Sequence, residues 1–366
     1  MQLPLQGQPL HTRSMLIELF QREDGALRLW GQVIDLRKAS FVPMVDDLHT
    51  AGLIHLMTLE MEVDRATRTI ASLVVDQPRV AVDASEKTEG QSCRDVQPRL
   101  QELVGLSFDA EFPGALKRSF GGPRGCTHLL TLLHLMASAL PPALDIEASQ
   151  GARVPGELIF RRSVFVDGHE PEEGRLHLAV QLMDFHSAPR GGAQTGMELL
   201  ALQHEARVLA DVDLSNLQVL DLAAIERDRS YATMGDASWR DEAGKVAGLV
   251  GRPVMPGFGK AVREHLEDDP NSRQLLDALV QVAPGFVQCT PALSDRMLQA
   301  IARDRAKGAS KGGSEAGAAK VPRFMASGGG VNACYMWRED SPLLQITPSA
   351  GQRGKKGQPQ RVGFRP

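Results

Sequence analysis

The amino-acid sequence contains the same pattern twice, and this internal repeat limits the possible folds more than any other feature. The stretch from Arg13, RSMLIELFQREDGALRLWGQVIDL, aligns without a gap with the stretch from Arg162, RSVFVDGHEPEEGRLHLAVQLMDF, at an offset of 149 residues. A second block, SCRDVQPRLQELVG from Ser92, matches SWRDEAGKVAGLVG from Ser238 at an offset of 146. Matches at a fixed offset over such lengths identify a duplicated unit, so both halves are expected to share one fold.

Each copy begins with alternating or β-branched apolar runs and ends with segments of helical spacing. In the first copy, LIELF, LRLWGQVIDL, IHLMTLEMEV and TIASLVV predict four strands in an antiparallel meander, with a turn at Asp24-Gly25. CRDVQPRLQELVG, FPGALKRSF and CTHLLTLLHLMASAL predict three helices, the last buried because it is apolar nearly all round. The predicted fold class is therefore α+β: a four-stranded meander followed by three helices, duplicated as an internal pseudo-dimer.

The repeat also predicts the domain organisation. A first repeat, residues 9–148, is followed by a degenerate second repeat, residues 155–290, with a Pro-rich linker, ALPPALDIEASQGARVPGE, near residue 148. Residues 291–345 are expected to hold a mobile Gly-rich loop, a helix and an extended segment, and residues 346–366 a disordered basic tail. Two homologous halves in one chain predict a monomer that contains its own dimer interface.

Composition and common motifs exclude several classes of function. The 41 Lys and Arg are balanced by 45 Asp and Glu, so a nucleic-acid partner is not predicted. There is no leader-like N-terminus and no segment judged long enough to cross a bilayer, so we expect a cytoplasmic protein with no membrane partner and reduced thiols. GxGxxG, P-loop, GxSxG, HExxH and paired CxxC motifs are absent, which removes the common nucleotide-binding, hydrolase and zincin classes.

Comparison of the two copies separates residues that the fold needs from residues that it can lose. Arg13, Asp35 and His55 are retained in the second copy, so they are interpreted as structural, with Arg13 and Asp35 paired across strands and His55 a hydrogen-bonded strand histidine. Four positions lose a metal-ligand or nucleophile type together: His11 becomes Phe160, Cys93 becomes Trp239, Cys126 becomes Ser272 and His128 becomes Gln274. This concerted loss predicts a chemical site in the first repeat, with packing cysteines as the alternative.

The stretch FGGPRGCTHL places two of these residues at a helix start. Gly125 allows a sharp turn into the helix, and Cys126 is expected at or next to the N-cap, where free amides and the helix dipole lower the pKa of a thiol. His128, two residues later, is expected to reach the same point as the thiol because the helix start is irregular.

Two chemistries remain open for this site. Cys93, Cys126, His128 and His55 offer the ligand types that zinc or iron takes, and no other cofactor is predicted. Alternatively, Cys126 is a nucleophile with His128 or His11 as its base. In that case the loop residues Gly122, Arg124 and Gly125 would cradle an anionic group.

The GCTHL helix start, the HTRS motif, the strand residues Gly31, Asp35 and Lys38, the IHLM strand and Cys93 together resemble a bacterial family known only as a domain of unknown function. The resemblance covers most of residues 9–140. In that family a C-terminal Cys-His element closes the domain. Here NACYMWREDSPLL is similar to that element, with Tyr335 in place of the histidine, which leaves open whether Cys334 joins the first-repeat site or lies with the second repeat. More faintly, the motif order is similar to iron–sulfur scaffold and sulfur-acceptor proteins, which would imply a metal or sulfur ligand.

These observations favour an enzyme of unknown reaction that acts on a small molecule through the Cys/His site of the first repeat, with the second repeat as an inactive structural partner. A non-catalytic binding or assembly module, and a metal or sulfur carrier, are the alternatives.

Overall fold

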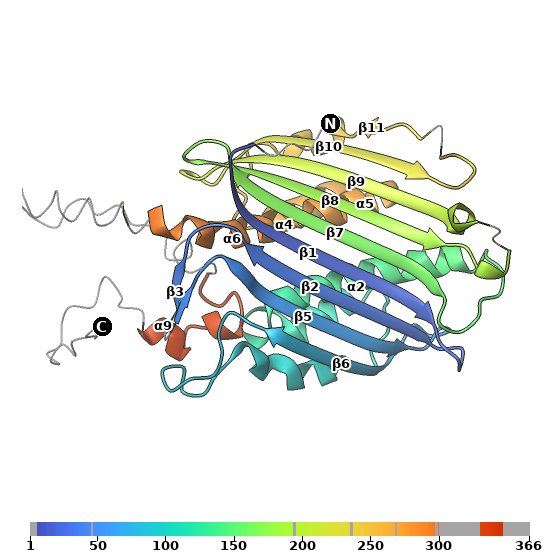
Figure 1. The fold of residues 1–366 in the computed structure, drawn as a ribbon, viewed down its shortest axis with the longest axis horizontal. Coiled ribbons are helices and arrows are strands. Elements are labelled where there is room, and N and C mark those ends of the chain that lie inside the picture. The colour runs from blue at the N-terminus through green and yellow to red at the C-terminus, as the bar shows by residue number, and fades with distance from the viewer. Residues whose placement is uncertain are drawn as a thin grey trace, which may run out of the picture.

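The computed structural model describes residues 6–44, 47–192, 195–234, 237–267, 269–296, 299 and 330–346. Both copies contribute to one nine-stranded antiparallel sheet (Figure 1). From one edge to the other its strands are β11 (Arg240–Asp241), β10 (Val219–Arg229), β9 (Leu200–Asp213), β8 (Arg175–Ser187), β7 (Leu158–Glu170), β1 (Gln8–Gln21), β2 (Leu27–Arg37), β5 (Gly52–Val63) and β6 (Ile70–Arg79). Each copy therefore forms the predicted meander.

The two meanders join through the antiparallel pair β1 and β7 at the centre of the sheet (Figure 1). In this pair Met15 lies opposite Val164, the residue that the 149-residue offset makes its equivalent. Arg13 pairs with Val166 and Ile17 with Arg162, and these two pairs are equivalent to each other as well. The register thus relates the two copies by an approximate two-fold axis that passes beside Met15.

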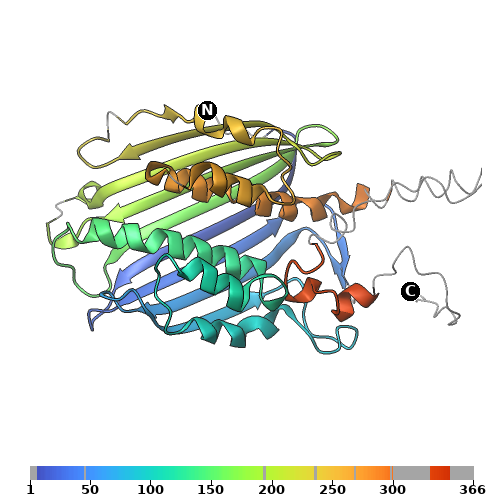
Figure 2. The ribbon, with the colours of Figure 1, turned by 180° about the vertical axis from the view of Figure 1, so that it is seen from behind.

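Helices cover one face of the sheet, as Figure 2 shows. In the first repeat they are the 3₁₀ helices η1 (Cys93–Leu103) and η2 (Gly122–Arg124) and the α-helices α1 (Phe112–Phe120) and α2 (Thr127–Glu147). In the second repeat they are α3 (Ala243–Val246), η5 (Ala247–Leu249), α4 (Phe258–Leu266), η6 (Pro270–Ser272), α5 (Arg273–Leu279), α6 (Val282–Cys289) and η7 (Thr290–Leu293). With α9 (Pro342–Ile346), the described residues form seven α-helices, and the α+β class is confirmed.

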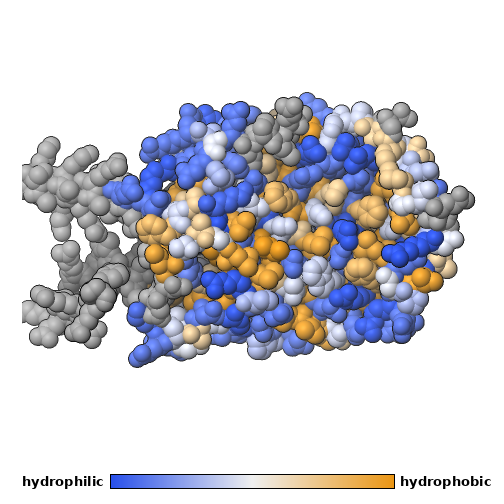
Figure 3. All heavy atoms as spheres, in the orientation of Figure 1, coloured by the Kyte–Doolittle hydropathy of each residue, from blue (hydrophilic) through white to orange (hydrophobic). Residues whose placement is uncertain are grey.

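The strand alternation places the core between the sheet and the helices. From Arg13 to the end of β1 every second residue, including Met15, Ile17 and Leu19, is buried toward the helices, and the residues between them are partly exposed. The uncovered face carries exposed apolar residues such as Leu36 and Phe165, and orange side chains gather among blue ones on this face in Figure 3. Antiparallel sheets tolerate one solvated face of this kind.

Several connections differ from the predictions. A small hairpin, β3 (Val42–Met44) with β4 (Asp47–His49), is inserted between β2 and β5 and was not predicted. 3₁₀ helices η3 (Arg190–Gly192) and η4 (Gly196–Leu199) lie between β8 and β9. The predicted CRDVQPRLQEL helix forms as the 3₁₀ helix η1, with Pro98 inside it.

Helix α2 corrects two further expectations. It continues through Pro141 and Pro142 to Glu147, so the linker is shorter than predicted and begins only after that residue. The extended helix is also long and apolar enough to cross a membrane by length and composition, contrary to our expectation. Half of its most apolar window is buried inside the molecule, and the packing of α2 on the sheet accounts for that apolar character.

The C-terminal segment, residues 330–346, returns to the first repeat. It contains η8 (Tyr335–Trp337) and α9, and both lie beside the first-repeat helices in Figures 1 and 2. The backbone amide of Tyr335 donates to the carbonyl of Gly125 at 2.8 Å. The Gly-rich loop before this segment and the basic tail after Ile346, both predicted from composition, lie outside the described residues.

Candidate metal centre

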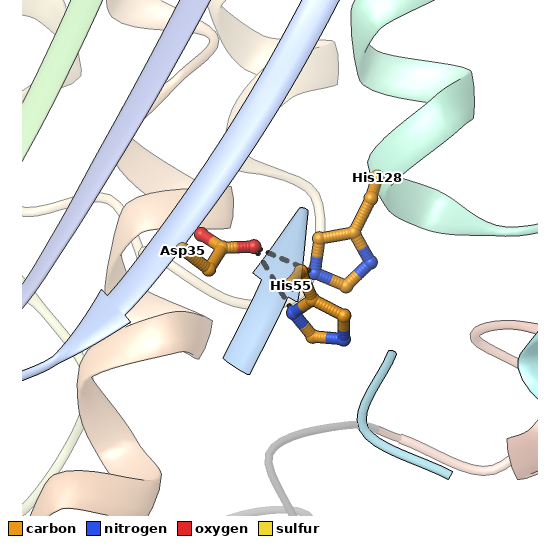
Figure 4. A group of neighbouring side chains, drawn as sticks. All are labelled: Asp35, His55 and His128. Atoms are coloured by element: carbon orange, nitrogen blue, oxygen red, sulfur yellow. Dashed lines mark hydrogen bonds and ion pairs between the residues drawn. The ribbon is translucent and has the colours of Figure 1, made fainter. Parts of the chain in front are cut away.

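Three buried side chains of the first repeat converge between the sheet and α2. Asp35 lies on β2, His55 lies opposite it on β5, and His128 lies in the first turn of α2 (Figure 4). Asp35 Oδ2 is 3.2 Å from His55 Nδ1 and 3.1 Å from His128 Nε2. One ligand atom of each residue lies within 4.8 Å of the other two, a spacing that could hold a metal ion.

Arg13 fixes the carboxylate of this group. It lies opposite Asp35 in the β1–β2 pair, and its Nε and Nη2 donate to Oδ1 and Oδ2 at 2.8 and 2.9 Å. Burial raises the pKa of Asp35, but the charge of Arg13 and the hydrogen bonds from the two histidines hold that pKa well below its ordinary value. The predicted cross-strand pair and the hydrogen-bonded His55 are confirmed, and Asp35 stays ionised.

Burial keeps two histidines near Asp35, His128 and His11, in the neutral form. Burial lowers the pKa of His128 to about 3, and its ring lies against that of His55 with 3.9 Å between the ring centroids. His11, from β1, has its pKa lowered to about 4, chiefly by burial, and its Nε2 is 3.5 Å from Asp35 Oδ1. Within the described residues, that buried Nε2 makes no hydrogen bond. Neutral imidazoles are the form that ligates metals.

Cys126 contacts the other side of the His128 ring. It is the N-cap residue of α2, as predicted, and its Sγ is 3.6 Å from His128 Nδ1. The predicted lowering of its pKa is wrong, because burial and the neighbouring Cys334 raise the pKa of Cys126 to about 12. The cost of removing a thiolate from water exceeds the favourable effect of the helix start.

The loop before Cys126 is held by close backbone contacts. A Cβ on Gly125 would lie 2.0 Å from the carbonyl oxygen of Phe120, so only glycine fits between the end of α1 and the start of α2. Arg124 Nε donates to the Ser119 carbonyl at 3.0 Å, and its half-exposed guanidinium lies 3.6 Å from Glu102. Gly122 has a positive φ of 57°. The predicted anion cradle of Gly122, Arg124 and Gly125 stays a prediction.

Two of the other three cysteines, Cys93 and Cys334, pack against one small apolar cluster. Cys93 is the first residue of η1, as predicted, after the N-cap Ser92. Burial raises the pKa of Cys93, and both Cys126 and Cys334 raise it further. Cys334 packs on the same small apolar cluster as Cys93, so the structure places it beside the first repeat. That it joins the first-repeat site stays a prediction.

The second repeat keeps the Arg–Asp pair without the rest of the group. Arg162 donates to both oxygens of Asp184 at 2.7 Å, and its Nη1 also contacts Asp277 at 2.7 Å. At the helix start, Ser272 Oγ donates to Asp269 at 2.6 Å. The retained arginine and aspartate thus have a structural role that does not need the ligand set.

The equivalent histidine of the second repeat contacts different residues. His204, the equivalent of His55, contacts Glu226 at 3.0 Å and Asp228 at 2.6 Å. No ligand group of the required spacing was found in the described part of this repeat.

Asp35 is the candidate ligand that the sequence comparison missed, because its retention in both copies favoured a purely structural role. A signal was present. Asp35 occupies a buried position in the alternation of β2, where a carboxylate needs several partners.

A family model described as a protein of unknown function, DUF2889, matches residues 11–141 and again residues 160–288. The chain belongs to this family. The two matches agree with the internal repeat and confirm the predicted resemblance to a family of unknown function. No curated protein and no solved structure matches the chain. The fainter similarity to iron–sulfur scaffold proteins stays a prediction.

Proposed function

We propose that the first repeat is a metal-dependent catalytic centre in which Asp35, His55 and His128 hold zinc or iron, and that the second repeat is its inactive structural partner in an internal pseudo-dimer. The observation that carries the proposal is the convergence of three buried ligand atoms within 4.8 Å of one another. It occurs in the copy that retains His128, where the second copy has Gln274.

The residues fit a metal chemically. Two imidazoles and one carboxylate are a common set for zinc enzymes and for non-haem iron, and they leave positions free for water or substrate. The buried Nε2 of His11, which lies beside Asp35 without a hydrogen bond, is a further nitrogen donor that the described residues leave unused. A buried nitrogen without a hydrogen-bond partner is rare in folded proteins, and a metal ion bound beside His11 would account for it.

The chain's own residues would prepare this centre. Arg13 keeps Asp35 ionised and fixes its orientation through two hydrogen bonds. Cys126 contacts the opposite nitrogen of His128 and so orients its ring, as outer partners of metal-binding histidines do. A bound metal would supply Lewis-acid activation of a water or substrate oxygen.

A second candidate function uses the same contacts without a metal. Cys126, His128 and Asp35 lie in the order of nucleophile, base and orienting carboxylate, and the 3.6 Å contact between Cys126 Sγ and His128 Nδ1 favours this candidate. The thiol and the imidazole are both neutral at ordinary pH, so the nucleophile would form only when the proton passes to His128.

Elemental analysis of matched variants tests the two candidates. His55→Gln and His128→Gln remove one ligand each, and His204→Gln makes the same change at the second-repeat equivalent of His55. We expect about one zinc or iron per chain in the wild type and in His204→Gln, and none in the two ligand variants. A metal-free wild type whose Cys126 alkylation rate falls in His128→Gln would overturn the metal centre in favour of the thiol candidate.

A further inference from the structure

Three arginines of the second repeat gather on the uncovered face of the sheet. Arg207 lies on β9, and Arg227 and Arg229 lie on β10, toward one edge of the sheet (Figure 1). Arg207 alternates with Ala206 and Val208, which are buried toward the helices, so its side chain lies on the other face. The register between β9 and β10 places Arg227 and Arg229 on that face as well. We call these three residues the arginine cluster.

One carboxylate, that of Glu205, lies within the arginine cluster. Arg207 Nε and Nη2 donate to Oε1 of Glu205 at 2.9 and 2.7 Å, and Gln181 donates to the same oxygen at 2.8 Å. Arg227 Nε and Nη2 donate to Oε2 at 2.9 and 2.6 Å. A carboxylate offers about four acceptor positions, so these hydrogen bonds saturate Glu205. The residue is only 2% exposed, and no further donor can reach it easily.

Arg229 makes no hydrogen bond to a carboxylate among the described residues. Its Nη2 lies 3.8 Å from Glu205 Oε2, beyond hydrogen-bonding distance, and donates to the neutral side chain of Gln203 at 2.8 Å. Its Nε is buried and has no hydrogen-bond partner in the part of the chain that the structure describes. A buried donor on a charged group is costly to leave without an acceptor. Arg229 therefore offers both a donor and a positive charge to an anion.

Trp239 holds the other two guanidinium groups. The centroid of its ring lies 4.5 Å from the guanidinium carbon of Arg207 and 4.2 Å from that of Arg227. Cation–π contacts of this kind restrain a guanidinium group and leave its charge in place. Because Glu205 and Trp239 both contact Arg207 and Arg227, these two side chains are pre-organised, and a ligand would lose little affinity in ordering them.

The first repeat lacks this arrangement. By the 149-residue offset, Leu56 and Thr58 stand where the second repeat has Glu205 and Arg207. The first repeat nevertheless forms the same meander, so the fold does not require the arginine cluster. The cluster is a feature that distinguishes the half without the Asp35 type of ligand group.

The charges of the cluster indicate the class of anion. Three guanidinium groups around one carboxylate leave two positive charges unbalanced within the described residues. A phosphate monoester carries a charge of about −1.5 to −2 at pH 7, which matches this surplus. Guanidinium groups also match the geometry of phosphate oxygens.

We propose that Arg207, Arg227 and Arg229 form a binding site for the phosphate group of a small molecule. The phosphate balances the surplus charge and gives Arg229 Nε an acceptor. The site is independent of the candidate metal centre, because Asp35 is buried between the sheet and α2 and the arginine cluster lies on the opposite face. The second repeat then contributes binding as well as structural support.

Calorimetric titration of the full chain with inorganic phosphate, at an ionic strength held constant with sodium chloride, tests the site. We expect the wild type to bind phosphate. Arg229→Gln should weaken binding by at least about tenfold, because it removes a charged hydrogen bond. Arg161→Gln is the matched control and should bind as the wild type does, because Arg161 lies on the same face but is paired with Glu18.

Tryptophan fluorescence gives a second readout of the same titration. Trp239 contacts two of the three arginines, so phosphate should change the fluorescence of the wild type. Trp239→Phe should lose this response and still bind phosphate in calorimetry. Circular dichroism checks that the variants keep their fold.

The outcomes separate the site from its alternatives. A wild type that binds no phosphate, or an equal affinity in Arg229→Gln and Arg161→Gln, overturns the site. Malonate, a dianion with carboxylate groups, tests the class, and tighter binding of malonate than of phosphate would overturn the assignment to phosphate. Glycerol phosphate distinguishes the two sources of the group. Tighter binding of this ester supports a phosphorylated metabolite, and tighter binding of inorganic phosphate supports the free ion.

Discussion

His128 Nε2 lies 3.1 Å from Asp35 Oδ2, and this contact joins the first turn of α2 to strand β2. The same carboxylate accepts from Arg13 and His55, so it connects three neighbouring strands and a helix. The packing of this half of the molecule and its candidate metal centre therefore share one buried charge. The consequences for stability can be tested separately from the binding experiments.

Arg13→Met leaves the Asp35 carboxylate buried without its cationic partner. Since breaking a buried ion pair by removing one member strands a charge, we expect a loss of about 3 to 5 kcal/mol in the free energy of unfolding. Urea denaturation at neutral pH measures it. Arg161→Met is the control, because its ion pair with Glu18 is partly exposed and should contribute less than about 1 kcal/mol. Equal small losses in both variants would contradict the structural role of Arg13.

Gly125→Ala tests the tight passage into α2. The added methyl group would meet the Phe120 carbonyl and ring, so the backbone must shift, at a cost of about 1 to 3 kcal/mol. Gly259→Ala, in α4, has no atom within 4 Å of the new methyl group and should be neutral or stabilising by up to about 1 kcal/mol. Thermal unfolding of both variants gives the comparison. A neutral Gly125→Ala would show that the loop is not constrained in this way.

Cys126→Ser and Cys289→Ser should differ in stability. Serine already stands at the equivalent of Cys126 in the second repeat, and its hydroxyl would have His128 Nδ1 as an acceptor. We therefore expect Cys126→Ser to lower the free energy of unfolding by less than about 1 kcal/mol. At Cys289 the hydroxyl enters the packed core against Gly168, with an expected loss of about 1 to 3 kcal/mol. Denaturant midpoints measured without metal decide the order, and the reverse order would indicate that Cys126 serves packing.

His204 should make the second repeat sensitive to alkaline pH. Its hydrogen bonds to Glu226 and Asp228 outweigh burial and raise its pKa above the ordinary 6.5. A raised pKa in the folded state contributes stability that is fully present below pH 6.5 and is lost as pH rises through the folded pKa. His204→Gln should therefore destabilise the protein most in mildly acidic buffer and least at alkaline pH. A destabilisation independent of pH would exclude this charge effect.

Periodicity and the repeat were sufficient to predict the meanders and the short helices, because those depend on local alternation and helical spacing. They failed at α2, where Pro141 and Pro142 indicated a linker. Burial of Leu140 and Ala143 against the rest of the core holds that stretch in the helix despite the prolines. This is a tertiary effect that a local signal does not contain.

The candidate site was predicted in part for a similar reason. Cys126 and His128 are close in sequence, so their contact followed from the helix start. The partnership of Asp35 with His128 depends on how α2 lies on the sheet. The raised pKa of Cys126 depends on burial and on Cys334, which arrives about 200 residues later in the chain. Neither relationship leaves a signal in a local pattern.

The pairing of Met15 with Val164 has a consequence for how the two halves could diverge. If each half were a separate chain meeting its twin along the same strand, every substitution would appear on both sides of the axis. Because a single chain supplies both strands, the halves are always present in equal number and a change in one is never copied into the other. The second half can therefore carry the ion pairs of His204 where the first half has the Asp35, His55 and His128 group, while still completing the sheet for the first.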